Sequence, residues 1–449
     1  MTTLKKPQFL ILLIGFLFQS PALSETLSLN LVGAMEFALK QNQLLAATRS
    51  DLVQAEAGLD QASGSFWPQV TVSTAYVDTD SPLHVFGSKL QQKKINSSDF
   101  IPATLNNPDN YQNVQTQVDV NLPLYQGGAL FAAKSQAKNY FAANKMGLAA
   151  QRQQLLFNVI QAYIRIFQAK AQMAAAEKSF QAAQRHLKTT KALHRKGVVI
   201  KSDVMDTDIH RLNAEIMLTQ ANNEYKTAED TLKHLLNMDI NTVLLLQQPD
   251  LFSDVIANKS LLIDWAAENR PDLLALKFQQ KFHRAGIAQA QSAFKPKLNM
   301  QLSKQWNSDK FELENEQSSI AVQLNWNVFS GGSDYAAVNK ASAKAVGVQH
   351  QIIDKQYAIR NEVRRAVRML DEAIQRQHVK QQAEQQSTEA LRIRTLRYKQ
   401  GLEKTNELLD SQAQLDASRA EFIRAKYNVT LARVTLLLTA GKLNLKDLQ

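Results

Sequence analysis

The chain has 449 residues, no cysteine, and 52 Lys and Arg residues against 41 Asp and Glu, which gives a formal net charge of +11. The length allows two or three ordinary domains or one large elongated domain. Without cysteine, the protein cannot form disulfides, use a thiol in catalysis, build a Cys-based zinc site or carry a lipid on cysteine. The basic residues are interleaved with Gln and Glu, which is typical of solvated helix faces and argues against a nucleic-acid partner.

Residues 1–24 have the pattern of a secretory signal peptide. Lys5 and Lys6 precede an apolar core over residues 9–18, and small residues follow up to Ser24. This core is too short to span a bilayer, and we expect cleavage near Ser24. The later apolar run 235–246 is interrupted by polar residues. The sequence therefore predicts an exported protein without a membrane-spanning helix.

The rest of the chain is an internal duplication. Residues 57–68, AGLDQASGSFWP, match residues 285–296, AGIAQAQSAFKP, at an offset of 228. From Val118 onward the offset is 204 and stays constant, as in the Gly pair 127–128 and its copy 331–332. The fall from 228 to 204 means that the first copy carries 24 extra residues before Val118. These residues are polar and rich in turn formers, which predicts an exposed loop.

Each copy contains two predicted strands. In the first copy Val118, Val120, Leu122 and Leu124 alternate with polar residues, and the same alternation recurs at Val322, Leu324, Trp326 and Val328. This pattern is typical of a strand with one apolar face. We predict strands over residues 69–77, 115–125, 297–306 and 318–329, with a helix over 44–65 or 271–293 leading into each pair.

A long helical hairpin follows each Gly pair. No proline occurs between Pro123 and Pro249 or after Pro296, and apolar residues recur three and four positions apart, which favours long packed helices. The outgoing helix of the first hairpin would be about 100 Å long. The returning helix is about half that length, so the helix before the strands could stack on its end. The predicted units are 25–237, an inter-repeat segment 238–263, 264–441 and a tail 442–449, with hairpins over 128–237 and 332–440.

Four one-faced strands cannot close a barrel by themselves, and open sheet edges are not tolerated in hydrocarbon. Strands that are apolar on one face suit a barrel wall with lipid outside and water inside. Two chains would give eight strands and a filled interior, whereas three chains would give twelve strands and a lumen. We therefore favour three chains over the alternative, a soluble sheet packed on a core.

In this order, and present twice, the motifs resemble those of the TolC-like outer-membrane efflux protein family. The motifs are Phe66-Trp67-Pro68 and Phe294-Lys295-Pro296, Leu124-Tyr125-Gln126-Gly127-Gly128 and Val328-Phe329-Ser330-Gly331-Gly332, Asn269-Arg270-Pro271-Asp272-Leu273, and Arg397-Tyr398-Lys399-Gln400-Gly401. The resemblance implies an α+β membrane protein whose homotrimer forms a 12-stranded outer-membrane β-barrel continued by a long α-helical periplasmic barrel. Residues 238–263 and the tail would form an equatorial belt.

The resemblance also implies a function and partners. Such a protein is the exit duct of a tripartite efflux pump or a type I secretion system. It passively conducts substrates that an inner-membrane transporter of the RND, ABC or MFS type delivers through a periplasmic adaptor (membrane fusion) protein. Outer-membrane lipid would surround the barrel, and no cofactor is expected.

Several site residues follow from the resemblance. The turns 195–204 and 398–410 would be periplasmic tips that contact the adaptor, with Gly197, Val198, Gly401 and Leu402 at the contact. Entrance residues would be Asp203, Glu407, Asp410 and the latch aromatic Tyr398, whereas Glu403 departs from the basic residue often found there. The junctions between barrel and helices would be Pro68, Gly127, Gly128, Pro296, Gly331 and Gly332. Two simpler alternatives stay open: plain helix turns, and acids on a solvated outer face.

Two other classes of function compete with the duct. A structural or adhesive coiled-coil protein of the cell envelope would need no lumen, and the alternation over 118–124 and 320–328 argues against it. An enzyme is not expected, because the motifs include no nucleophile–base set. The eight histidines form no ligand pattern, which predicts scattered surface positions. The sequence does not indicate which substrate is exported.

Overall fold

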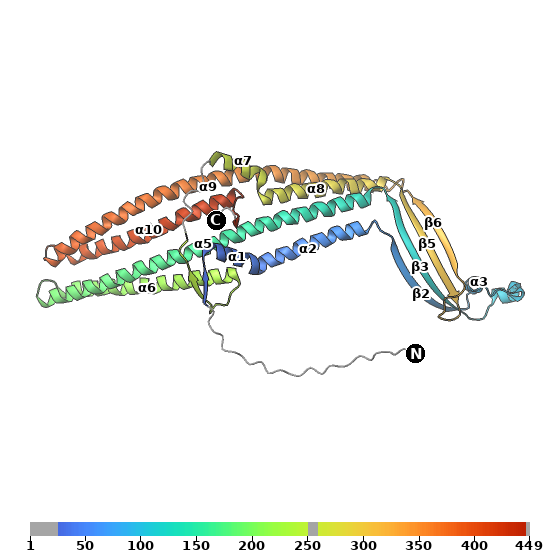
Figure 1. The fold of residues 1–449 in the computed structure, drawn as a ribbon, viewed down its shortest axis with the longest axis horizontal. Helices are drawn as coiled ribbons and strands as arrows, with labels where there is room; N and C mark the ends of the chain where they lie inside the picture. Colours follow the sequence, from blue (N-terminus) through green and yellow to red (C-terminus); the bar gives the residue numbers. More distant parts are fainter. Residues whose placement is uncertain (1–25, 250–258, 446–449) are drawn as a thin grey trace, which may run out of the picture.

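The structure is a computed structural model that describes residues 26–249 and 259–445. The predicted signal peptide, residues 1–24, lies outside the described residues. Long helices form one end of an elongated molecule and a four-stranded sheet forms the other (Figure 1). No described helix is both long enough and apolar enough to cross a bilayer.

The sheet is antiparallel in the order β2-β3-β5-β6. Its strands are β2 (Gln69–Thr79), β3 (Tyr111–Gln126), β5 (Lys297–Ser308) and β6 (Gln317–Asn325). The predicted end of the last strand at residue 329 is wrong. Asn325 pairs with Lys297, the first residue of β5. Residues 326–329 lie beyond this pair, where β5 offers no residue to which they could bond. On β3 a bulge after Pro123 lets pairing continue to Gln126.

The two faces of this sheet differ in chemistry. Even-numbered positions carry apolar side chains that are exposed, including Val70, Val72, Ile320 and Val322. Odd-numbered positions carry amides that bond across strands, as in Gln115 to Gln305 at 3.0 Å. A sheet with an exposed apolar face and a hydrogen-bonded polar face is suited to lipid on one side and water on the other.

The insertion between β2 and β3, which the sequence predicts to be an exposed loop, is mostly exposed but also contains short helices. It contains α3 (Pro82–Gln91), a short 3-10 helix η1 (Ser97–Phe100) and α4 (Pro102–Asn106). Lys89 bonds Asp99 at 2.6 Å, and the Asp99 carboxylate is buried. Asn96 and Asp99 form a capping box that orders the turn. Turn-forming residues such as Asn96 therefore cap helical turns here.

Two hairpins of very long helices form the other end. Each outgoing helix, α5 (Ala129–Arg195) and α9 (Ser333–Lys399), has 67 residues and is therefore about 100 Å long. The returning helices α6 (Lys201–Leu236) and α10 (Thr405–Thr439) have 36 and 35 residues. Gly147 and Gly347 do not interrupt α5 or α9.

The shorter helices complete the length, as the sequence predicts. Helix α2 (Gln43–Gly64) packs on the half of α5 that α6 does not cover. Asn42 joins these pieces, because its side chain accepts the N–H of Leu45 and donates to the carbonyl of Leu235. In the second copy α8 (Pro271–Gln291), followed by a 3-10 turn at Ser292–Phe294, packs against both α5 and α9.

A compact layer surrounds the middle of the helices. It contains α1 (Leu31–Gln41), α7 (Lys259–Asn269) and the parallel pair β1 (Thr26–Leu29) and β4 (Val243–Leu246). Tyr163 lies fully buried beneath this layer and donates from its hydroxyl to the carbonyls of Gln247 and Leu29 at 2.5 and 3.2 Å. Burial raises the pKa of Tyr163 to about 12, so the hydroxyl stays a donor that fastens β1 and β4 to α5.

Candidate functional site

The two helical turns lie together at the end of the molecule farthest from the sheet (Figure 1). Gly197 and Gly401 both have φ of +74°, a left-handed conformation that glycine adopts without strain. A Cβ at Gly401 would lie 3.8 Å from a methyl carbon of Val198, so the tips of the two hairpins are neighbours. Val198 and Leu402 are exposed apolar side chains at these tips.

Tyr398 is buried where the two hairpins meet. Its hydroxyl lies 3.0 Å from the hydroxyl of Thr190 on α5 and 3.4 Å from that of Thr405 on α10. Thr207 on α6 in turn lies 3.5 Å from Thr190. Tyr398 therefore connects the outgoing helix of one hairpin to the first turn of the return helix and to the other hairpin. This position suits the latch role that the resemblance implies.

The three predicted entrance acids have different surroundings. Asp203 is half-buried and accepts the N–H of Ile200 at 3.2 Å, so it caps α6. Glu407 is exposed and bonds Arg394, and this hydrogen bond raises the pKa of the Arg394 guanidinium. Asp410 is exposed and makes no ion pair within the described residues. Of the three, Asp410 is the acid whose carboxylate neither caps a helix nor forms an ion pair in the described chain.

Glu403, the departure from the family pattern, has a partner of its own. Its carboxylate lies 2.8 Å from Arg397 and 3.6 Å from Arg394. Arg394 therefore contacts both Glu403 and Glu407, and the turn of the second hairpin is held by a small ion-pair network. Position 403, where the resemblance implies a basic residue, thus carries an acid that is paired with two arginines on α9.

Three of the eight histidines, His186, His210 and His283, are half-buried, contrary to the expectation from sequence. His186 on α5 and His210 on α6 lie half-buried near Asp416 and Gln412 of α10. Burial lowers the pKa of both histidines, and the charges of Arg185 and Lys399 lower that of His186 further. The Nδ1 atom of His210 is buried without a hydrogen-bond partner in the described chain. Sequence spacing could not reveal this pair, because the two residues lie on different helices.

The junction residues lie where sheet becomes helix. Pro68 and Pro296 directly precede β2 and β5. Gly128 and Gly332 precede α5 and α9 with φ of +89° and +83°, and Gly127 and Gly331 both have φ of +63°. The copies differ in packing: a Cβ at Gly127 would lie 2.6 Å from the carbonyl oxygen of Ser292, whereas one at Gly331 would meet no atom within 4 Å.

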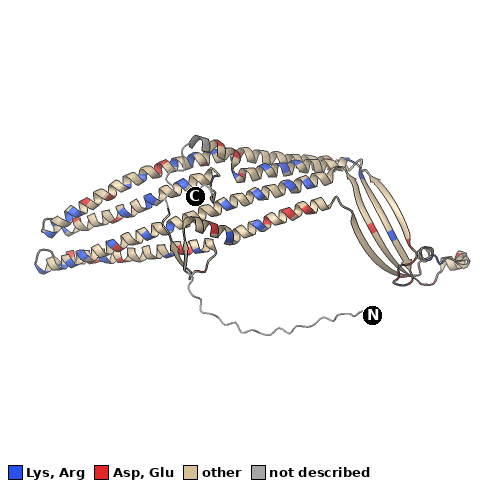
Figure 2. Cartoon of the chain, in the orientation of Figure 1, with Lys and Arg blue, Asp and Glu red and all other residues tan. Residues whose placement is uncertain are grey.

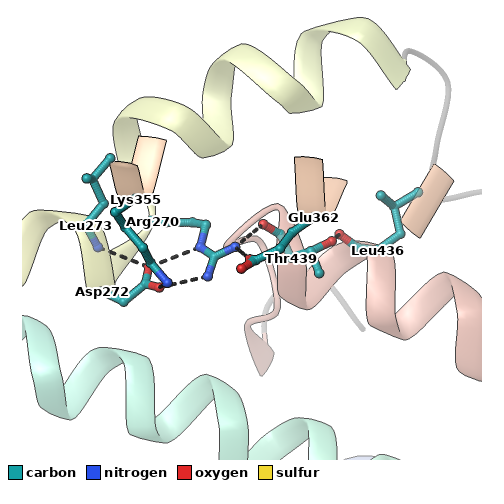
Figure 3. Close-up of polar contacts among 7 residues, drawn as sticks. All are labelled: Arg270, Asp272, Leu273, Lys355, Glu362, Leu436 and Thr439. Carbon is teal, nitrogen blue, oxygen red and sulfur yellow. Dashed lines mark hydrogen bonds and ion pairs between the residues drawn. The ribbon is translucent and has the colours of Figure 1, made fainter. Parts of the chain in front are cut away.

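Arg270, in the motif Asn269-Arg270-Pro271-Asp272-Leu273, joins three helices (Figure 3). Its guanidinium donates to Asp272 at 3.0 and 2.7 Å, to Glu362 on α9, and to the carbonyl of Thr439 at the end of α10 at 3.2 Å. Lys355 also bonds Asp272, at 2.9 Å. Burial raises the pKa of Asp272, but the hydrogen bonds from Arg270 and Lys355 outweigh it and set the pKa at about 2. The motif is thus a structural lock between α8, α9 and α10.

Charges are distributed unevenly along the molecule. Lys, Arg, Asp and Glu are frequent along the helices and sparse on the four strands (Figure 2). The strand residues Asp119 and Lys304 are among the few charged ones. Within residues 26–249 and 259–445, no three or more His, Asp or Glu side chains are grouped so that they could hold a metal ion.

The sequence matches the family described as outer membrane efflux protein over residues 35–238 and 262–442. It is 22% identical over 443 residues to the outer membrane efflux protein BepC of Brucella suis, covering 95% of this chain and 88% of BepC. It is 21% identical over 311 residues to the alkaline protease secretion protein AprF of Pseudomonas aeruginosa. That match covers 67% of this chain and 64% of AprF, slightly less than two thirds of the relative's length.

Solved structures share the fold. The Campylobacter jejuni CmeC outer membrane channel superposes with a TM-score of 0.80 at 17% identity, covering 92% of this chain and 85% of that chain. The open state of the Neisseria gonorrhoeae MtrE outer membrane channel superposes with a TM-score of 0.74 at 16% identity, covering 92% and 89%. At these identities the likeness is one of architecture.

Proposed function

Because the chain belongs to the outer membrane efflux protein family, we propose that it passively conducts substrates from a periplasmic entrance to the outside of the cell. It is an outer-membrane efflux channel of the kind used in tripartite efflux or type I secretion systems. One observation carries the proposal. A sheet with an exposed apolar face and a polar face continues directly into helical hairpins about 100 Å long.

The family forms trimeric channels that work with efflux pump partners. In a homotrimer of this chain, β2 and β6 are the outer strands of each sheet and would pair between neighbours. Three sheets of four strands then close a 12-stranded barrel, and six helical hairpins continue its wall. Closure lets the N–H and C=O groups of both edge strands form hydrogen bonds, which lipid hydrocarbon cannot provide.

Partner contacts and gating belong at the helical tips. The turns 195–204 and 398–410 would meet the periplasmic adaptor, and an inner-membrane transporter of the RND, ABC or MFS type would supply the energy. Contacts that separate α9 from α5 would break the hydroxyl bonds of Tyr398 and widen the entrance. The predicted signal peptide over residues 1–24 would direct the chain across the inner membrane.

Single-channel recording of the purified trimer in planar bilayers tests the proposal. We expect a steady conductance that divalent cations block from the periplasmic side, and a weaker block when Glu407→Ala and Asp410→Ala are combined. A heat-modifiable trimer in outer-membrane fractions that conducts nothing would instead favour a structural envelope protein. Unaltered cation block in the double variant would remove the two acids from the entrance.

A further inference from the structure

The insertion between β2 and β3, here called the cap (residues 80–110), lies at one end of the sheet (Figure 1). We propose that three caps form a constriction at the outer mouth of the channel. The inference rests on the proposed function, because it needs a lumen to constrict. The cap lies beyond the strand ends that are farthest from the helices (Figure 1), which is the end that would face outside the cell.

The lumen face of the sheet can be recognised from its side chains. On β3, Gln115, Gln117 and Asp119 are all odd-numbered, and they form a hydrogen-bonded row. Gln305 of β5 extends this row to Gln317 of β6 at 2.6 Å. The even-numbered face carries the exposed valines and leucines instead. Water-filled barrels place polar residues inside and apolar residues toward lipid, so the odd-numbered face is the lumen.

The cap is attached to this lumen face. Gln92 at the end of α3 is only 1% exposed, and its amide donates to Asn113 at 2.9 Å while it accepts the Tyr111 hydroxyl at 2.7 Å. Asn113 donates onward to Asn307 of β5 at 3.1 Å. Gln317 of β6 donates to the carbonyl of Gln91 at 3.4 Å. All four strand residues are odd-numbered. The cap is therefore bonded directly to lumen-facing side chains of β3 and β6, and through Asn113 to β5.

Two ion pairs involve the cap, and the partly buried one lies within it. Lys89 and Asp99 join α3 to η1 at 2.6 Å, and Lys94 bonds Asp309 at 2.8 Å in the connection between β5 and β6. The cap therefore reaches from the end of β2 to the β5–β6 connection of its own chain. These contacts order the cap against the strand ends of its own sheet, where it would border the mouth of a closed barrel.

The cap also presents apolar side chains that one chain leaves uncovered. Leu83 is 79% exposed and Phe100 is 62% exposed, and Ile101 and Leu105 are exposed as well. The occupant that fits is the cap of the other two copies. The cap begins at β2, an outer strand of the sheet, so it starts at the seam between neighbours. Burying these side chains between copies would remove them from water.

The dimensions allow the caps to meet. Twelve strands about 4.8 Å apart and tilted by about 40° give a barrel radius of about 12 Å. Helix α3 has 10 residues and is therefore about 15 Å long. The length of α3 is thus comparable with the radius of the opening, so three caps are large enough to narrow it. The second copy has only the residues 309–316 between its strands, so it supplies no such element.

Cysteine labelling from outside the cell tests the constriction without depending on the periplasmic entrance. The chain has no cysteine, so Ser319→Cys, an exposed lumen-face position on β6, would be the only reactive site. Lys310→Cys, on the exposed β5–β6 connection, is the matched control. A maleimide carrying a polyethylene-glycol chain should label Lys310→Cys about tenfold faster than Ser319→Cys, because a constriction admits solutes by size. Replacing residues 81–110 with a copy of 309–316 should remove that difference.

The outcomes separate the two proposals. Equal labelling of Ser319→Cys in the native and shortened chains would overturn the constriction while leaving the channel intact. Failure of even a small maleimide to label Ser319→Cys in the shortened chain would overturn the channel and the constriction together. In a full-length chain, Phe100→Cys should give disulfide-linked dimers under oxidation, because copies meet at the axis. Absence of these dimers would overturn the contact between caps even if the shortened chain fails to fold.

Discussion

Replacing Arg270 with alanine should loosen the middle of the helical barrel by a predictable amount. The guanidinium is 13% exposed, whereas Asp272 and Glu362 are 31% and 43% exposed. Removing one partner of a buried ion pair costs roughly 3–5 kcal/mol, and a hydrogen bond to a charged group contributes about 1.5–3 kcal/mol. Water can reach both carboxylates here, so we expect the loss to be about 2–3 kcal/mol.

Hydrogen exchange of the intact trimer measures this loss locally. A change of 2–3 kcal/mol corresponds to about a 30- to 150-fold fall in amide protection. The fall should be confined to the start of α8 and the last turn of α10, because Arg270 joins Asp272 to the carbonyl of Thr439. Arg376→Ala, which removes an exposed i,i+4 pair with Glu372 on α9, is the matched control and should change these amides little. Equal effects of the two variants, or less than about a threefold effect of Arg270→Ala, would refute the lock.

Three further predictions follow from the junctions, the latch and the buried histidines. Gly127→Ala should reduce the yield of heat-stable trimer more than Gly331→Ala, since both acquire left-handed strain but only Gly127 would meet a carbonyl oxygen at 2.6 Å; equal yields would contradict this. Tyr398→Phe should cost about 1 kcal/mol of closed-state stability and raise the open probability in planar bilayers about fivefold; an unchanged value would count against the latch. Burial lowers the pKa of His186 and His210, so the unfolded state binds more protons and stability falls as the pH drops below about 6.5. Amide hydrogen exchange in α6, corrected for its intrinsic rate, should therefore become faster as the pH falls. This pH dependence should disappear when both histidines are replaced by glutamine.

Elements of the fold that depend on a local sequence pattern could be predicted from the sequence. Alternation of period two and the absence of proline identify strands and long helices, because both depend on residues close in the chain. The end of β6 could not be predicted, since it depends on where β5 begins to offer partners. The insertion is predictable from the change in offset, but its helices are not, because Asn and Asp favour both loops and helix caps. Asn96 followed by Asp99 three residues later is a capping-box signal that could have indicated order.

The site residues also divide into those that a local pattern predicts and those that only tertiary packing brings together. Gly197 and Gly401 were found from sequence, because a tight turn needs glycine wherever it occurs. The Arg270 motif was noticed, but its partner Glu362 lies 92 positions away, and no local pattern specifies such a pair. The charge of Glu407 was visible in the sequence, whereas its pairing with Arg394 across the turn of the hairpin was not. Side chains brought together by packing on separate helices need the tertiary structure.

The duplication also explains how one chain could control both ends of a duct. At the helical tips the locking groups come from the second copy, in which Tyr398 and Arg394 make the contacts. The positions 204 residues earlier hold His194 and Thr190, and Thr190 is there the partner that Tyr398 bonds. At the outer end the arrangement is reversed, because only the first copy carries the cap. In a trimer, two similar copies per chain give the wall approximate sixfold symmetry. Where the copies differ, at each end, the contacts have only threefold symmetry. A change confined to one copy can therefore alter one proposed gate without disturbing the other.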